Sequence, residues 1–279
     1  MRFLRRHLLP PAARGKIPAS HRDRRFCHGL LSALLLCQGC VSMSATGVST
    51  TAASSGGAAA ANLNLGAAYL RQGRLTLALE RLDRALDHDP RLAEAHSTIA
   101  MVYDRLGDVD EARNHHRRAI RLAPNNPATA NSYGVFLCRH ERWSDAEPLF
   151  LRAADNPRYH TPEVALTNAG ICARNAGDGA KAERYLHDAL ARNPVYADGL
   201  FNLAALAFAN NELDEAGRLL DRHFESAPDS AQAAWLCFQV ETRLENRGNA
   251  RRCASVLREQ FPESPESARL ELLENGGRP

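Results

Sequence analysis

The sequence predicts an all-α protein, built as a right-handed superhelical solenoid of six helix-turn-helix repeats. Three observations predict this fold. Alanine recurs at one position with a spacing close to 34 residues, proline recurs at a second position with nearly the same period, and aromatic residues make up only 6% of the chain. A repeat of this length indicates stacked supersecondary units that bury their core against their neighbours.

Residues 1–39 predict a signal peptide. The first 25 residues hold eight basic side chains and one acidic side chain, and a short apolar run follows from Leu30 to Leu36. Because spanning a bilayer takes roughly 20 apolar residues, this run indicates an export signal and not a membrane helix. Without residues 1–25, the 35 basic and 32 acidic residues of the chain become 27 and 31. This negative balance argues against a nucleic-acid partner.

The end of the signal resembles that of a bacterial lipoprotein, in which a peptidase cuts before a cysteine that receives lipid. Gly39 and Cys40 occupy the last two positions of that pattern, so the resemblance implies lipidation of Cys40. Val41 after the cysteine implies sorting to the outer membrane. The alternative is an ordinary cleaved signal with an incidental cysteine, because Cys37 and Gln38 replace the usual Leu and small residue.

Residues 40–61 predict a flexible tether that joins the signal to the repeats. They are mostly Ala, Ser, Thr and Gly, with almost no side chain able to form a core. Such a segment cannot offset the entropy lost on ordering. The repeats are expected over residues 62–276, and they include a capping helix near residues 265–273.

Each repeat carries small residues where its two helices should meet. A large side chain there would separate the helices, and the proline after the second helix ends it and fixes the turn into the next repeat. The small first-helix residues are Gly66, Ala100, Gly134, Gly170 and Ala204; the second-helix alanines are Ala78, Ala112, Ala146, Ala182, Ala216 and Ala250; the prolines are Pro90, Pro124, Pro157, Pro194, Pro228 and Pro262. The third repeat contains a two-residue insertion before Pro162.

The sequence shows no pattern typical of an enzyme. It has no glycine-rich phosphate loop and no His-Glu-x-x-His, and its Cys-x-x-Cys spacing lies in the signal. His96, His115 and His116 are near one another, but adjacent residues of a helix diverge by about 100°, so no metal site is expected. We therefore expect a non-enzymatic protein with no cofactor, no metal and no small-molecule substrate.

Four cysteines follow the signal region, and four cysteines in an exported protein favour disulfides. Cys138 and Cys172 lie in the first helices of repeats three and four, which should pack side by side, so a bridge between these repeats is one interpretation. Cys237 and Cys253, in the two helices of repeat six, are a second candidate pair. The alternative is small buried thiols that fill gaps in the core.

First-helix side chains of a solenoid line a continuous concave face where partners bind. Large apolar residues exposed on that face predict a partner-binding groove, and a polar residue such as Asn131 can bind a partner's backbone. The alternative is that part of the set packs beneath neighbouring repeats. The predicted groove residues are Leu63, Leu70, Met101, Asn131, Val135, Phe201, Phe208 and Trp235.

Thirty-four residues is the period of tetratricopeptide repeats. Residues 131–138 (NSYGVFLC) and 167–172 (TNAGIC), together with six repeats, a lipoprotein-like signal and two cysteines, resemble the type IV pilus biogenesis and stability lipoproteins, or pilotins. The resemblance implies a lipid-anchored protein on the periplasmic face of the outer membrane that assists localisation and multimerisation of the pilus secretin. The alternative is a general periplasmic scaffold, soluble or anchored, for cell-envelope or cytochrome-maturation assembly.

Overall fold

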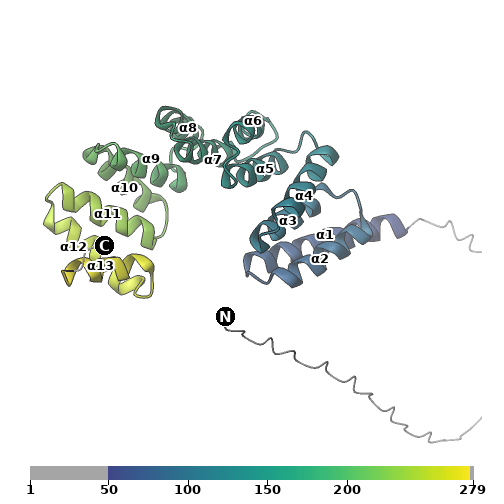
Figure 1. The fold of residues 1–279 in the computed structure, drawn as a ribbon, viewed down its shortest axis with the longest axis horizontal. Coiled ribbons are helices and arrows are strands. Elements are labelled where there is room, and N and C mark those ends of the chain that lie inside the picture. Colours follow the sequence, from purple (N-terminus) through teal and green to yellow (C-terminus); the bar gives the residue numbers. More distant parts are fainter. Residues whose placement is uncertain (1–49, 277–279) are drawn as a thin grey trace, which may run out of the picture. The chain divides into compact units, whose positions relative to one another are not determined.

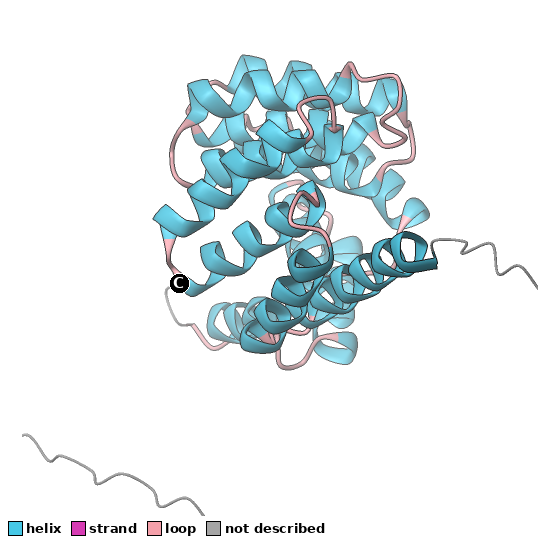
Figure 2. Cartoon of the chain, turned by 90° about the vertical axis from the view of Figure 1, so that its right-hand side faces the viewer, coloured by secondary structure: helices cyan, strands magenta, loops and turns pink. Residues whose placement is uncertain are grey.

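The computed structural model describes residues 50–276, with side chains from Gly56 onward, and these residues form helices and turns without a strand (Figure 2). The predicted signal peptide, the predicted lipid-bearing Cys40 and residues 40–49 of the tether lie outside the described residues. No helix within the described part combines the length and apolar character that a membrane crossing requires.

Twelve helices form six hairpins, each of which pairs a first helix A with a second helix B (Figure 1). The A helices are α1 (Thr50–Arg71), α3 (Ala93–Leu106), α5 (Pro127–Arg139), α7 (Pro162–Asn175), α9 (Ala197–Ala209) and α11 (Ala231–Arg243). The B helices are α2 (Leu75–His88), α4 (Val109–Leu122), α6 (Trp143–Ala154), α8 (Gly179–Arg192), α10 (Leu213–Ser226) and α12 (Arg247–Gln260), and α13 (Pro265–Glu274) follows them. The predicted all-α solenoid of helix pairs is confirmed.

Helices A and B approach each other closely at the predicted glycines. A Cβ atom added to Gly66 would lie 2.7 Å from Cγ of Leu82, and one added to Gly134 would lie 2.7 Å from Cε1 of Phe150. Gly170 has the same relation to Cγ of Leu186, at 2.8 Å. These distances are shorter than carbon atoms tolerate, so each glycine makes room for one large side chain of helix B.

Repeat six reverses this arrangement of sizes. Its helix A carries Phe238 where the other repeats have Gly or Ala, and its helix B carries Ala254 where repeats one, three, four and five have Leu or Phe. Ala254 is buried, and Phe238 packs against the core cluster that contains it. The combined volume at the crossing is therefore roughly conserved while its two contributors exchange roles, as close packing requires.

The A helices line up more closely than the B helices. Each A helix contacts the A helix of the next repeat, and α11 also contacts α13, whereas within residues 50–276 no B-helix backbone closely approaches that of the next B helix. Each B helix also packs against the A helix of the next repeat, so both helices of a hairpin join successive repeats. Between repeats three and four the B helices are also linked by side chains, because Lys181 and Tyr185 of α8 donate to Glu147 of α6.

The turn between helices A and B requires a left-handed residue in every repeat. In three repeats this residue is a glycine: Gly73, Gly107 and Gly177 have φ of 72°, 83° and 82°. In the other three repeats a non-glycine residue has positive φ at the equivalent position. These residues are Glu141 (59°), Asn211 (64°) and Glu245 (57°). In this left-handed conformation, the Cβ atom of a residue comes too close to the following carbonyl oxygen. Asn tolerates the conformation better than Glu does.

The solenoid begins earlier than the sequence predicted. Residues 50–61, expected to belong to a flexible tether, form the first half of α1, and Ala59 is buried. The prediction overlooked that a run of alanines has the highest helix propensity and continues a helix already packed at its far end. The predicted C-terminal capping helix corresponds to α13, whose Leu270 is fully buried.

Replacing Glu141 with Gly is expected to stabilise the protein by about 0.5–1 kcal/mol, because the relief of left-handed strain outweighs the extra chain entropy of glycine. Glu141 is exposed, so little packing is lost. Urea denaturation of wild type and variant measures the change. Asn211→Gly is the matched control and should change the free energy of unfolding less, and an equal or opposite effect of the two substitutions would contradict the strain argument.

Candidate protein-binding face

The face formed by the A helices is joined across consecutive repeats by polar and cation–π contacts. Each contact links a side chain of one A helix to the neighbouring A helix, so the face is fixed by its own side chains as well as by the core beneath it. These contacts are Arg105 Nη1 to the Leu70 carbonyl oxygen (2.6 Å), Asn168 Nδ2 to Asn131 Oδ1 (3.0 Å), Arg174 Nη1 to Asn202 Oδ1 (3.5 Å) and the Arg243 guanidinium to the Phe208 ring centre (4.3 Å).

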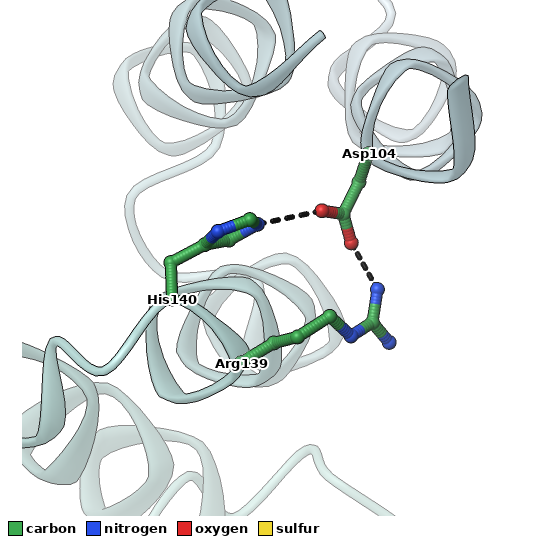
Figure 3. Close-up of polar contacts among 3 residues, drawn as sticks. All are labelled: Asp104, Arg139 and His140. Atoms are coloured by element: carbon green, nitrogen blue, oxygen red, sulfur yellow. Dashed lines mark hydrogen bonds and ion pairs between the residues drawn. The ribbon is translucent and has the colours of Figure 1, made fainter. Parts of the chain in front are cut away.

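Between repeats two and three the link is ionic. Asp104 near the end of α3 accepts a hydrogen bond from Arg139 at the end of α5, and its second oxygen lies 2.7 Å from Nε2 of His140 (Figure 3). The Asp104 side chain is only 5% exposed. A buried carboxylate needs such partners, because leaving a charge unpaired out of water is strongly unfavourable.

The structure distributes the eight predicted groove residues among three environments. Met101 is exposed, at 38% of its maximal surface, and suits a partner contact. Leu70 is only 6% exposed and belongs to the first core cluster, so its assignment to the groove is wrong. Its side chain packs in that cluster with Ile99 and Val102 of α3. The other six residues are half-buried: Leu63, Asn131, Val135, Phe201, Phe208 and Trp235.

Two of these half-buried residues rest on their own repeat. The ring centre of Phe201 lies 5.8 Å from that of His223 on α10, and the ring centre of Trp235 lies 5.6 Å from that of Phe238, one turn along α11. Phe208 is instead covered on one face by Arg243 of the next repeat. Each aromatic ring thus combines a packed side with a remaining accessible surface. Rings held in this way lose little freedom on binding.

A cavity of about 220 Å³ opens between α5 and α7, beside the Asn131–Asn168 pair. Val135 and Ile171 supply apolar walls, and Asn168, Asn175 and Arg139 supply donors. Of these, the sequence prediction included only Val135. Alignment of the repeats would have found Ile171, because it stands one residue after Gly170 as Val135 does after Gly134.

Both candidate cysteine pairs are bonded in the structure. Cys138 of α5 joins Cys172 of α7 with Cα atoms 5.6 Å apart, and Cys237 of α11 joins Cys253 of α12 with Cα atoms 6.0 Å apart. Both separations lie within the range that a disulfide spans. The first bridge ties adjacent repeats along the A side, and the second closes the hairpin of repeat six.

We expect all four thiols to resist alkylation in protein isolated from an oxidising compartment without reductant. Cross-linking positions 34 residues apart should stabilise the fold by about 3–4 kcal/mol in the chain-entropy model. Mass spectrometry after alkylation and thermal unfolding with and without reductant measure both effects. The Cys237→Ser/Cys253→Ser variant isolates the bridge between repeats, and free Cys138 and Cys172 in that variant would exclude it.

The three histidines considered as metal ligands do not converge on a metal site. His96 Nδ1 lies 3.1 Å from Nδ1 of His115, and its Nε2 accepts from Arg118, whereas His116 points into the core. No group of three His, Cys, Asp or Glu side chains suited to a metal ion occurs within residues 50–276. Burial lowers the pKa of both His96 and His115.

His116 replaces a core hydrophobic residue of the repeat. It is 1% exposed and stacks on Tyr133, with ring centres 5.2 Å apart, and neither ring nitrogen has a partner among the described residues. Equivalent positions hold Leu82, Phe150, Leu186 and Leu220. Burial lowers the pKa of His116 to about 4; the nearby Asp104 opposes that shift, and His115 and Arg139 reinforce it.

Because the pKa of His116 is lowered in the folded state, the free energy of unfolding should fall as the pH is lowered. Above pH 6.5 the imidazole is neutral in both states; as pH falls from 6.5 towards 4, the unfolded chain takes up the proton first and the folded state loses stability. We expect wild type to lose about 1 kcal/mol more than His116→Leu between pH 7.5 and 5.5. Urea midpoints at both pH values test this, and parallel losses would show that His116 does not titrate as stated.

Known proteins match both the repeats and the whole solenoid. Models of the tetratricopeptide repeat match residues 57–125, 97–160 and 173–237, which together span more than half of the chain. The type IV pilus assembly protein PilF of Pseudomonas aeruginosa is 25% identical over 209 residues, which cover 75% of this chain and 83% of that protein.

Two solved structures share the fold. The crystal structure of PilW, described as a widely conserved type IV pilus biogenesis factor, is 27% identical with a TM-score of 0.67 and covers 76% of this chain and 97% of that one. The structure of Pseudomonas aeruginosa PilF is 24% identical with a TM-score of 0.65 and covers 78% of this chain and 98% of that one. The chain therefore belongs to the tetratricopeptide-repeat family, and it is homologous to proteins of type IV pilus assembly.

Proposed function

We propose that this chain is a non-enzymatic, protein-binding lipoprotein of type IV pilus biogenesis, which assists outer-membrane localisation and multimerisation of the pilus secretin. The observation that carries the proposal is the similarity to the pilus biogenesis factor PilW, which extends over 97% of that chain and not over a single repeat. A match to isolated repeats would support only a protein-binding module, because tetratricopeptide repeats serve many processes.

The A-helix face is the proposed binding surface. The links between its helices, from Arg105–Leu70 at one end to Arg243–Phe208 at the other, hold it in one arrangement before a partner arrives. A preformed surface spends little of its interaction free energy on ordering itself. Met101 and the accessible sides of Val135, Phe201 and Trp235 provide apolar contacts, while Asn131 supplies an amide that can bind a partner's backbone.

The proposed anchor is lipid on Cys40, at the periplasmic face of the outer membrane. One acyl chain alone binds a membrane reversibly, so stable anchoring takes more than one chain. Residues between Cys40 and the first packed turns of α1 would separate the solenoid from the bilayer. The lipid would then carry a bound secretin subunit to the membrane in which it multimerises.

The proposal is tested by the assembly state of the pilus secretin in a strain that lacks this gene. We expect loss of the heat-resistant multimer from membrane fractions, full rescue by the wild-type gene and weaker rescue by Cys40→Ala. Unchanged multimers and normal pili in the deletion strain would reject the pilus role. An envelope defect without pilus loss would instead support a general periplasmic scaffold.

Groove contacts are tested on purified protein with the periplasmic part of the secretin. Phe201→Ala and Trp235→Ala are each expected to weaken binding by about 1–2 kcal/mol, because buried aromatic anchors carry much of an interface's free energy. Val195→Ala is the matched control, since this exposed residue lies in the turn before α9 and away from the A-helix links. Loss of helicity with unchanged affinity of the folded fraction would assign both aromatic residues to the core.

A further inference from the structure

A second cavity lies away from the A–A links, where repeat five meets repeat six. Its volume is about 490 Å³, and α10, α11 and α12 line it. The apolar part of its wall comes from Phe224, Ala234 and Val256, with the Cys237–Cys253 bridge beside them. Cavities of roughly 300–1,000 Å³ have the size of ligand sites in proteins.

One wall of this space is less bulky than in the two preceding repeats. The position of Ala234 holds Leu166 in repeat four and Leu200 in repeat five, although repeat three also has an alanine there, Ala130. Ala234 itself is buried, so the accessible apolar surface of the cavity comes from the half-buried Phe224 and Val256.

The charge of the cavity also departs from the repeat pattern. Four carboxylates line it, namely Asp221, Glu225, Asp229 and Glu241, against one basic side chain, Arg252. Positions equivalent to Glu241 carry apolar or aromatic residues in all five other repeats: Tyr69, Tyr103, Leu137, Ala173 and Ala207. A carboxylate has thus replaced a core-type side chain at this single place.

These carboxylates lack cationic partners in the protein. Oε2 of Glu241 is buried without a hydrogen-bond partner, and Asp229 accepts only from the neutral amide of Gln260 at 3.0 Å. No ion pair joins Asp221, Glu225 or Glu241 to another residue between Gly56 and Gly276. A buried carboxylate oxygen without a partner is unfavourable unless a ligand supplies the missing donor.

We propose that this cavity is a second docking site, for a segment of another protein that carries a lysine or arginine beside an aliphatic residue. The aliphatic side chain would pack against the half-buried Phe224 and Val256, and the cation would pair with Glu225 and Glu241. A metal ion does not fit, because no three ligand side chains converge among the described residues. A purely apolar ligand would leave the carboxylates desolvated and unpaired, and an acidic one would be repelled.

The test uses the full chain and the peptide acetyl-Leu-Lys-Leu-Lys-Leu-amide, followed by backbone amide shifts of the ¹⁵N-labelled protein. We expect saturable shifts confined to α10–α12, and the dissociation constant should rise with salt because the pairs are partly exposed. Acetyl-Leu-Glu-Leu-Glu-Leu-amide should bind at least about five-fold more weakly, since its charges oppose those of the cavity.

Two variants locate the binding. Val256→Ser removes a half-buried apolar side chain from the cavity wall, and it should weaken the lysine peptide by about five-fold or more while preserving the fold. Glu225→Gln/Glu241→Gln should have a similar effect. Glu183→Gln/Asp188→Asn is the matched control, because it removes two carboxylates from exposed positions of α8 and should change affinity by less than about two-fold.

The proposal is overturned if the lysine peptide causes no localised shifts at millimolar concentration, if its shifts fall on the A helices, or if both peptides bind equally. Lysine-peptide binding that is unchanged by Val256→Ser would also overturn it. If the carboxylate variant fails to fold, as circular dichroism would show, the comparison of the two peptides on wild type still decides. If this chain forms a dimer whose interface is α10–α12, a second copy and not another protein occupies the cavity, which would also overturn the proposal.

Discussion

The structure depends on the close approach of two helices at one point in every repeat. At Gly66, Gly134 and Gly170 there is no room for a Cβ, because a leucine or phenylalanine of helix B occupies that volume. The crossing sets how each hairpin closes, and the hairpin in turn sets where the next A helix packs. Repeat six exchanges the small and large residues between Phe238 and Ala254, so the constraint acts on total volume and not on particular residue types.

From this constraint follows the difference between the two sides of the solenoid. Consecutive A helices touch, so their side chains meet across repeats, and the Asp104–Arg139 and Asn131–Asn168 contacts fix the surface. The backbones of consecutive B helices lie farther apart within the described residues, although Lys181 and Tyr185 of α8 bond to Glu147 of α6. A surface that is continuous and held by its own contacts is the one suited to bind an elongated partner.

The sequence predicted the repeat number and the helix pairs, because periodic Ala, Gly and Pro residues report local packing that recurs unchanged. It predicted less where tertiary context decides. Leu70 carries the same kind of side chain as an exposed groove residue, and only the position of α3 shows that it is buried. The early start of α1 depended on helix propagation through alanines that carry no periodic signal. The cavity between α10, α11 and α12 depends on how these three helices pack, which no periodic residue of the sequence reports.

The claim that the A-helix face binds the secretin is tested most directly by amide hydrogen exchange of the full chain, with and without the secretin's periplasmic region. Slowed exchange is predicted in peptides from α3, α5, α7, α9 and α11, with little change in the B helices α4, α6 and α8, because the partner would cover only the A side. Protection confined to the B helices, or no protection under conditions where the complex forms, would contradict this account.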